Sequence, residues 1–140
     1  MATTNEVITV AHAVQQSVAP VFLITGVGSL LSVLSVRLAR VIDRFRTLDE
    51  LQDKITEEIK LEMSTLIRRA RWIHWAITLC TTSALLVCIV IAALFIGSEL
   101  NKDPSGTISF FFTTAMLTLT AGLVCFLREI SLSIGVIRLR

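Results

Sequence analysis

Apolar residues fill three stretches of the chain, and charged residues separate and follow them. The uncharged, largely apolar stretches cover residues 7–36, 73–96 and 107–127, and each is long enough for a helix to cross the hydrocarbon core of a bilayer. The first would make about 45 Å of helix, whereas that core is about 30 Å thick. Because Pro20 removes a backbone donor, we expect a kink there, with an interfacial helix over 5–19 and a transmembrane span over 18–36.

The segment between the first two apolar stretches, residues 37–72, is rich in charge and lacks Gly and Pro. Its apolar residues recur at helical spacing: Leu48, Leu51, Ile55, Ile59, Met63 and Leu66. Two helix-start signals compete for the turn that must follow, Thr47 with Glu50 and Thr56 with two glutamates after it. A turn near residues 53–56 gives arms of similar length, and therefore predicts an antiparallel helical hairpin.

The remaining connections are shorter. Residues 97–106 contain Pro and Gly and predict an exposed turn. Residues 128–140 alternate apolar side chains with Ser and Arg, and predict a short helix on the membrane surface.

Composition and charge placement set the fold class and the orientation. An apolar fraction of 54% is too high for a soluble fold of 140 residues. Of the 13 basic residues, 12 lie in 37–71 or 128–140, so the positive-inside rule places both segments in the cytoplasm and the N-terminus and the 97–106 loop outside. The sequence predicts an all-α, three-span integral membrane domain over 1–140, with a cytoplasmic helical hairpin over 37–72 and a cytoplasmic tail.

The first span has two different faces at 100° per residue. Small and polar residues share one face: Thr25, Gly28, Ser29, Ser32, Ser35 and Asp43. Large aliphatic residues share the opposite face, which we expect to meet lipid: Leu23, Val27, Leu30, Leu31, Leu34 and Leu38. The polar stripe fits close packing between helices. It also fits a water-filled path between several copies, with Asp43 or Arg40 forming a charged ring at its mouth.

A similar small-residue face in the third span indicates helix contact: Thr114, Thr118, Ala121, Gly122 and Cys125. Three helices bury little between themselves, so we expect one such face to meet another subunit in a homo-oligomer.

Residues with chemistry are few in the apolar stretches. No Asp, Glu, Lys or Arg occurs between Val7 and Val36 or within the other two stretches, so a proton relay or an intramembrane hydrolase lacks its acid and base groups. Cysteines 80, 88 and 125 have no metal-site spacing and are interpreted as packing residues, and His12 and His74 lack neighbouring ligands. We expect no enzyme activity, no cofactor and no nucleic-acid partner.

Seven arginines lie near the two ends of the hairpin where it meets the membrane: Arg37, Arg40, Arg44, Arg46, Arg68, Arg69 and Arg71. They are candidates for contact with anionic lipid headgroups. The same residues also serve as an orientation signal for the spans.

Four segments carry a family resemblance. PVFLITGVG, RLARVIDRFR, LIRRAR and FLRE occur in this order, and together they resemble the bacterial membrane family catalogued as domain of unknown function 2721 along nearly the whole chain. The resemblance implies a small prokaryotic three-span protein of the inner (plasma) membrane and brings no catalytic residues. Two functions stay open: a pore or ion channel lined by the first span, or a scaffold or accessory subunit that docks a protein partner through the hairpin.

Overall fold

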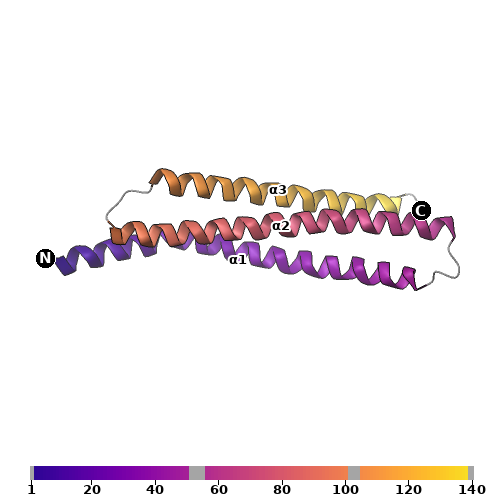
Figure 1. The fold of residues 1–140 in the computed structure, drawn as a ribbon, viewed down its shortest axis with the longest axis horizontal. Helices are drawn as coiled ribbons and strands as arrows, with labels where there is room; N and C mark the ends of the chain where they lie inside the picture. Colours follow the sequence, from indigo (N-terminus) through magenta and orange to yellow (C-terminus); the bar gives the residue numbers. More distant parts are fainter. Residues whose placement is uncertain (1, 51–55, 101–104, 139–140) are drawn as a thin grey trace.

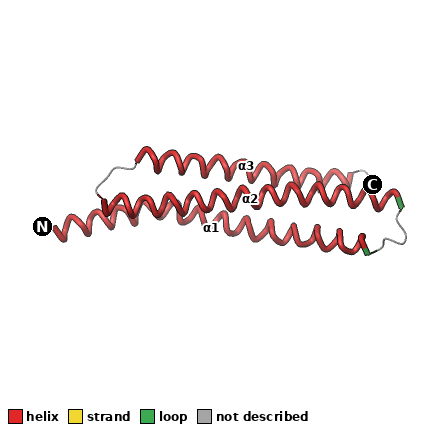
Figure 2. The backbone as a smooth tube through the Cα atoms, in the orientation of Figure 1, coloured by secondary structure: helices red, strands yellow, loops and turns green. Residues whose placement is uncertain are grey.

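Three long helices make up the fold. The computed structural model describes residues 2–50, 56–100 and 105–138. Its elements are α1 Ala2–Asp49, α2 Glu57–Leu100 and α3 Ser105–Arg138 (Figure 1). The described residues contain no strand (Figure 2), so the all-helical prediction is confirmed. Each helix includes a segment that is long and apolar enough to cross a membrane.

The second helix lies between the other two. α1 and α3 each run antiparallel to α2 and pack against it (Figure 1), whereas direct packing between α1 and α3 is slight. The N-terminus lies at one end of the bundle and the C-terminus at the other. α2 therefore carries most of the contacts that hold the protein together.

The seam between α1 and α2 has the spacing of a coiled coil. Buried residues recur every seven positions on α1: Ala13, Pro20, Val27, Leu34, Val41 and Leu48. They recur in the same way on α2: Leu66, Ile73, Cys80 and Val87. Partly buried residues such as Leu31, Leu38, Met63 and Ala70 fill the positions between them. This alternation of three and four residues keeps one stripe of each helix turned toward its partner, so the seam runs without a break from the apolar stretch into the hairpin.

This seam corrects the expected lipid face of the first span. Val27 and Leu34 are 3% and 0% exposed, and Leu23, Leu30, Leu31 and Leu38 pack against the same core. The reason lies beyond the apolar stretch. Val41 and Leu48 continue the stripe into the charged segment and are buried in the same core cluster, as expected for apolar side chains among charged residues. A coiled-coil stripe keeps its direction along the helix, so the aliphatic side chains of the span also face α2.

Small residues bring α2 and α3 close together. A Cβ atom added at Gly122 would lie 3.0 Å from Cys80 Sγ and 3.4 Å from the Ala76 carbonyl oxygen. The buried Ser83 hydroxyl donates a hydrogen bond to the Ala115 carbonyl oxygen at 2.8 Å. Close approach through small residues and one interhelical hydrogen bond is a usual way for membrane helices to associate. The predicted helix contact is confirmed at Gly122.

Two expected boundaries inside the helices are absent from the described residues. α1 continues through Pro20 from Ala2 to Asp49, so residues 5–19 do not form a separate helix. Ala13 and Ser17 before the proline and Val27 after it are all buried, so packing on both sides of Pro20 accompanies the continuous helix. α3 likewise continues to Arg138, so the tail extends the third helix and is not a separate surface helix.

Parts of both connections between the helices lie outside the described residues. α2 begins at Glu57, beside the second of the two start signals, and the amide nitrogen of Ile59 donates to the Thr56 carbonyl oxygen at 3.0 Å. Residues 53–55 of the expected first turn lie outside the described residues. In the second connection, α2 is helical to Leu100 and α3 begins at Ser105, which is shorter than the turn expected over 97–106; residues 101–104 lie outside the described residues.

Candidate functional site: a buried carboxylate between two arginines

The most distinctive polar group of the bundle joins all three helices. Arg37 follows the uncharged stretch of α1, Arg69 shortly precedes that of α2, and Glu129 shortly follows that of α3. Antiparallel packing brings these three borders to the same level. The side chains consequently meet where the apolar part of the bundle gives way to the charged part.

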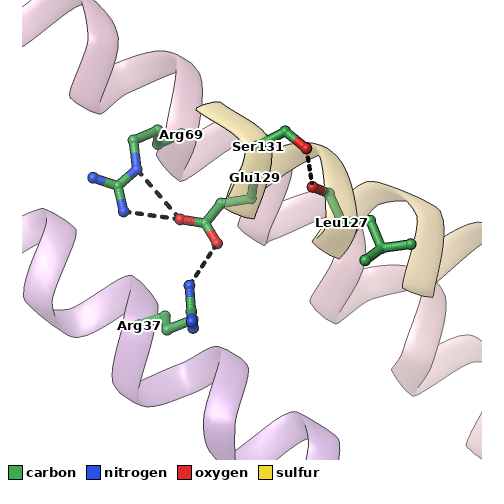
Figure 3. Close-up of polar contacts among 5 residues, drawn as sticks. All are labelled: Arg37, Arg69, Leu127, Glu129 and Ser131. Carbon is green, nitrogen blue, oxygen red and sulfur yellow. Dashed lines mark hydrogen bonds and ion pairs between the residues drawn. The ribbon is translucent and has the colours of Figure 1, made fainter. Parts of the chain in front are cut away.

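Glu129 accepts hydrogen bonds on both carboxylate oxygens (Figure 3). Arg37 Nη1 donates to Oε2 at 3.0 Å, and Arg69 donates to Oε1 from Nη2 at 2.9 Å and from Nε at 3.3 Å. The Glu129 side chain is 0% exposed, while those of Arg37 and Arg69 are 39% and 23% exposed. We name these three residues the triad.

The two arginines of the triad offset the cost of burying the Glu129 carboxylate and leave the group with a net positive charge. A carboxylate removed from water is strongly unfavourable unless it is paired and hydrogen-bonded, and Glu129 has three N–H donors from two cations. Two arginines and one glutamate leave a formal charge of +1. Since α1 and α3 pack little against each other, the bond from Arg37 to Glu129 is a principal link between them.

Two further contacts lie close to that link. The Arg37 guanidinium carbon lies 5.3 Å from the centroid of the Phe126 ring, a distance at which a cation is attracted to an aromatic face. On α3 the Ser131 hydroxyl donates to the Leu127 carbonyl oxygen at 3.0 Å (Figure 3). Both contacts lie within one helical turn of Glu129.

A second ion pair lies farther along the hairpin. Arg44 Nε donates to Glu62 Oε1 at 2.8 Å, and the two side chains are 54% and 43% exposed. Arg44 is seven residues after Arg37 and Glu62 is seven before Arg69, as antiparallel heptads require. An exposed pair of this kind contributes little stability, about 0–1 kcal/mol. Its main significance is that it shows the register in which α1 and α2 pack.

The structure divides the seven predicted arginines. Arg37 and Arg69 bind Glu129, and Arg44 binds Glu62. The other four are exposed and make no ion pair within the described part of the chain: Arg40, Arg46, Arg68 and Arg71. The sequence interpretation missed Glu129. The available signal was its position as an acid at the border of an apolar stretch, level with two arginine clusters.

The polar stripe of the first span lies on the outer side of α1. Thr25, Gly28, Ser29, Ser32, Ser35 and Asp43 are all exposed, so the structure places none of them against α2 or α3. The hydroxyls of Thr25, Ser29 and Ser35 donate to backbone carbonyl oxygens four residues earlier, at 3.2, 3.2 and 2.9 Å. These hydroxyls use their single donor within the helix, and their oxygen atoms remain as acceptors on the surface.

Other candidate ligands are dispersed. Among the described residues, no group of three His, Cys, Asp or Glu side chains is arranged to hold a metal ion. His12 Nε2 lies 3.2 Å from Gln16 Nε2 on an exposed part of α1. Cys80, Cys88 and Cys125 are free cysteines.

Comparison with known proteins gives a family. Residues 17–139 match the family model described as Protein of unknown function (DUF2721). No curated protein and no solved structure matches the chain. The matched segment contains the triad, the polar stripe and the seam between α1 and α2 from Pro20 onward, and the chain belongs to the DUF2721 family.

Proposed function

We propose that this protein is the subunit of a homo-oligomeric membrane pore in which the outer faces of several α1 helices surround a common axis. The observation that carries the proposal is the division of α1: its aliphatic face is occupied by α2, and its stripe of hydroxyl groups is left exposed. A stripe of small and hydroxyl residues along a membrane helix is typical of a face that meets another helix or lines a water-filled path.

The chemistry of the stripe favours water and cations over anions. Because the hydroxyl donors of Thr25, Ser29 and Ser35 are used within the helix, the stripe offers oxygen acceptors, which solvate positive charge. Asp43 lies 18 residues after Thr25 on the same face, and in a symmetric assembly it would form an acidic ring.

A gate is available on the same face. Val36 lies between the hydroxyl groups and Asp43, and its side chain is 52% exposed. A ring of such apolar side chains can close a narrow pore by excluding water. We place this constriction on the hairpin side of the membrane.

The proposed orientation follows the positive charges. The hairpin and the end of α3 carry most of the arginines, so both lie in the cytoplasm and the N-terminus lies outside. The membrane we propose is the inner (plasma) membrane of a bacterium, and the proposed role is not enzymatic.

Flux measurements test the pore. Purified oligomer in liposomes should conduct cations under voltage or osmotic challenge, and Ser32→Leu should reduce this flux while the oligomer stays intact. Thr120→Leu, at an exposed hydroxyl of α3, is the matched control and should conduct like the wild type. Loss of the oligomer in Ser32→Leu would instead assign the stripe to packing. A folded wild-type oligomer that passes no ion would contradict the pore.

A scaffold is the second candidate, and the continuous seam favours it. Val41, Leu48 and Leu66 are buried between the hairpin arms, which leaves the charged side chains on the outside of a helical rod. The rod extends beyond the triad by about 18 Å, given 12 residues of α1 at about 1.5 Å each. Such a rod suits docking of a protein partner. Capture of a defined partner that is lost in Glu58→Lys but kept in Ser32→Leu would support it, and recovery of self alone would count against it.

A further inference from the structure

Arg37 of the triad and Arg40, on the same helix, both keep N–H donors that no described residue uses. Arg37 donates one hydrogen bond, to Glu129, and makes no other among the described residues. Its side chain is 39% exposed, so its remaining N–H donors are accessible. Arg40 follows three residues later on the same flank of α1, is exposed, and has no partner in the described ranges. Residues three apart on a helix are neighbours, so two cationic groups lie side by side.

An anion is the missing partner of this pair. Like charges one turn apart repel each other. Two acids lie near the pair: Glu129 already accepts three hydrogen bonds, and Asp43, three residues after Arg40, offsets one of the positive charges without an ion pair among the described residues. The local charge stays positive after the pairing within the triad is counted. Two guanidinium groups, each with several N–H donors, match the oxygen atoms of a phosphate group.

Apolar side chains lie on the membrane side of the same pair. Val33 is four residues before Arg37 on this flank and is 49% exposed. Phe126 lies beneath the Arg37 guanidinium. The cationic groups thus lie beyond the end of the uncharged stretch, and the apolar groups lie within it. A phospholipid has the matching order, with its phosphate outside and its acyl chains inside the hydrocarbon.

We infer that Arg37 and Arg40, with Val33 and Phe126, form a binding site for one anionic phospholipid. Its phosphate lies between the two guanidinium groups, and an acyl chain lies along Val33 and Phe126 in the hydrocarbon. The site borders the proposed pore face, because Arg40 lies about 60° from Asp43 around α1 at 100° per residue, but its test counts bound lipid and does not require a conducting oligomer. It also distinguishes among the seven arginines: Arg44 and Arg69 are engaged by glutamates, and Arg46, Arg68 and Arg71 contribute diffuse surface charge.

Arg71 provides a matched control for the experiment. It is exposed, has no partner within the described chain and lies two residues from Arg69, on the side of the triad that faces the apolar stretch. On α2 it faces away from α1. The variants Arg40→Gln and Arg71→Gln therefore remove equal charge, with Arg71 about 7.5 Å nearer the apolar stretch, and neither breaks a described ion pair.

The test uses full-length protein in mixed micelles with equal amounts of phosphatidylglycerol and phosphatidylcholine, and native mass spectrometry counts the lipids retained per protomer. The wild type should retain phosphatidylglycerol preferentially. Arg40→Gln should lower that preference by about tenfold or more, as expected for the loss of a hydrogen bond to a charged group. Arg71→Gln removes only surface charge and should lower it by about fivefold at most, and Arg40→Lys should restore most of the preference. Equal losses in Arg40→Gln and Arg71→Gln, or no preference in the wild type, would overturn the site. Displacement of phosphatidylglycerol by inorganic phosphate alone would show a free-anion site and would also overturn it.

Discussion

Arg37 on α1 and Glu129 on α3 are 92 residues apart in sequence and are joined by a hydrogen bond of 3.0 Å. The helices that carry them pack mainly against α2. This one contact, completed by Arg69, therefore closes a three-helix arrangement whose outer members would otherwise meet little.

The triad should matter more to stability than any exposed ion pair. Glu129→Gln leaves two arginines without their counter-charge, and should lower the free energy of unfolding by roughly 3 kcal/mol, near the lower end for a broken buried pair because both guanidinium groups keep some solvent contact. Denaturant titration in a mild detergent measures it.

Glu62→Gln is the control for that measurement. It removes the same charge from the exposed pair with Arg44 and should change the unfolding free energy by less than about 1 kcal/mol. Equal effects of the two substitutions would show that the triad has no special role.

The contact between α2 and α3 should be intolerant of side chains at Gly122. Gly122→Leu should lower the unfolding free energy by at least about 2 kcal/mol through overpacking, because even a Cβ atom there would lie 3.3 Å from Leu79 Cβ. Gly26→Leu places the same side chain where nothing lies within 4 Å and should be nearly neutral. A tolerant Gly122 would mean that the helices lie farther apart than described.

Orientation can be measured with single cysteines. Thr56 directly precedes α2 and Ser105 is the first residue of α3; the two residues lie at opposite ends of the bundle and both are exposed. In a background without the native cysteines, a membrane-impermeant maleimide added to intact cells should label Ser105→Cys and leave Thr56→Cys unlabelled until the cells are opened. The opposite labelling would reverse the orientation inferred from the charges.

The sequence was sufficient to predict the three helices, but hydropathy alone did not show which face of each helix packs against a neighbour. Long uncharged stretches separated by charged segments lead directly to three apolar helices. The faces of α1 were harder, because hydropathy does not distinguish a side chain that meets lipid from one that meets another helix. The heptad pattern from Val27 to Leu48 shows which face of α1 packs against another helix. Its last members lie in the charged hairpin segment, where apolar side chains are expected to be buried against the other arm.

Pro20 and Glu129 show two other limits. Proline predicts a kink or break from local chemistry alone, but α1 is continuous and has buried residues on both sides of Pro20. Glu129 looked like the ordinary charged end of a span, since its burial depends on residues 60 and 92 positions away. Both features are set by tertiary contacts that local patterns do not contain.

Cross-linking between subunits tests the central claim most directly. Ser32→Cys, in a background where Cys80, Cys88 and Cys125 are replaced by alanine, places a thiol on the outer stripe of α1, and Thr120→Cys places one on the exposed side of α3. If α1 helices surround a common axis, mild oxidation in the membrane should convert Ser32→Cys into a disulfide-linked dimer and leave Thr120→Cys monomeric. Dimers formed through Thr120→Cys but absent from Ser32→Cys would contradict an assembly built on the face of Thr25, Ser29 and Ser32.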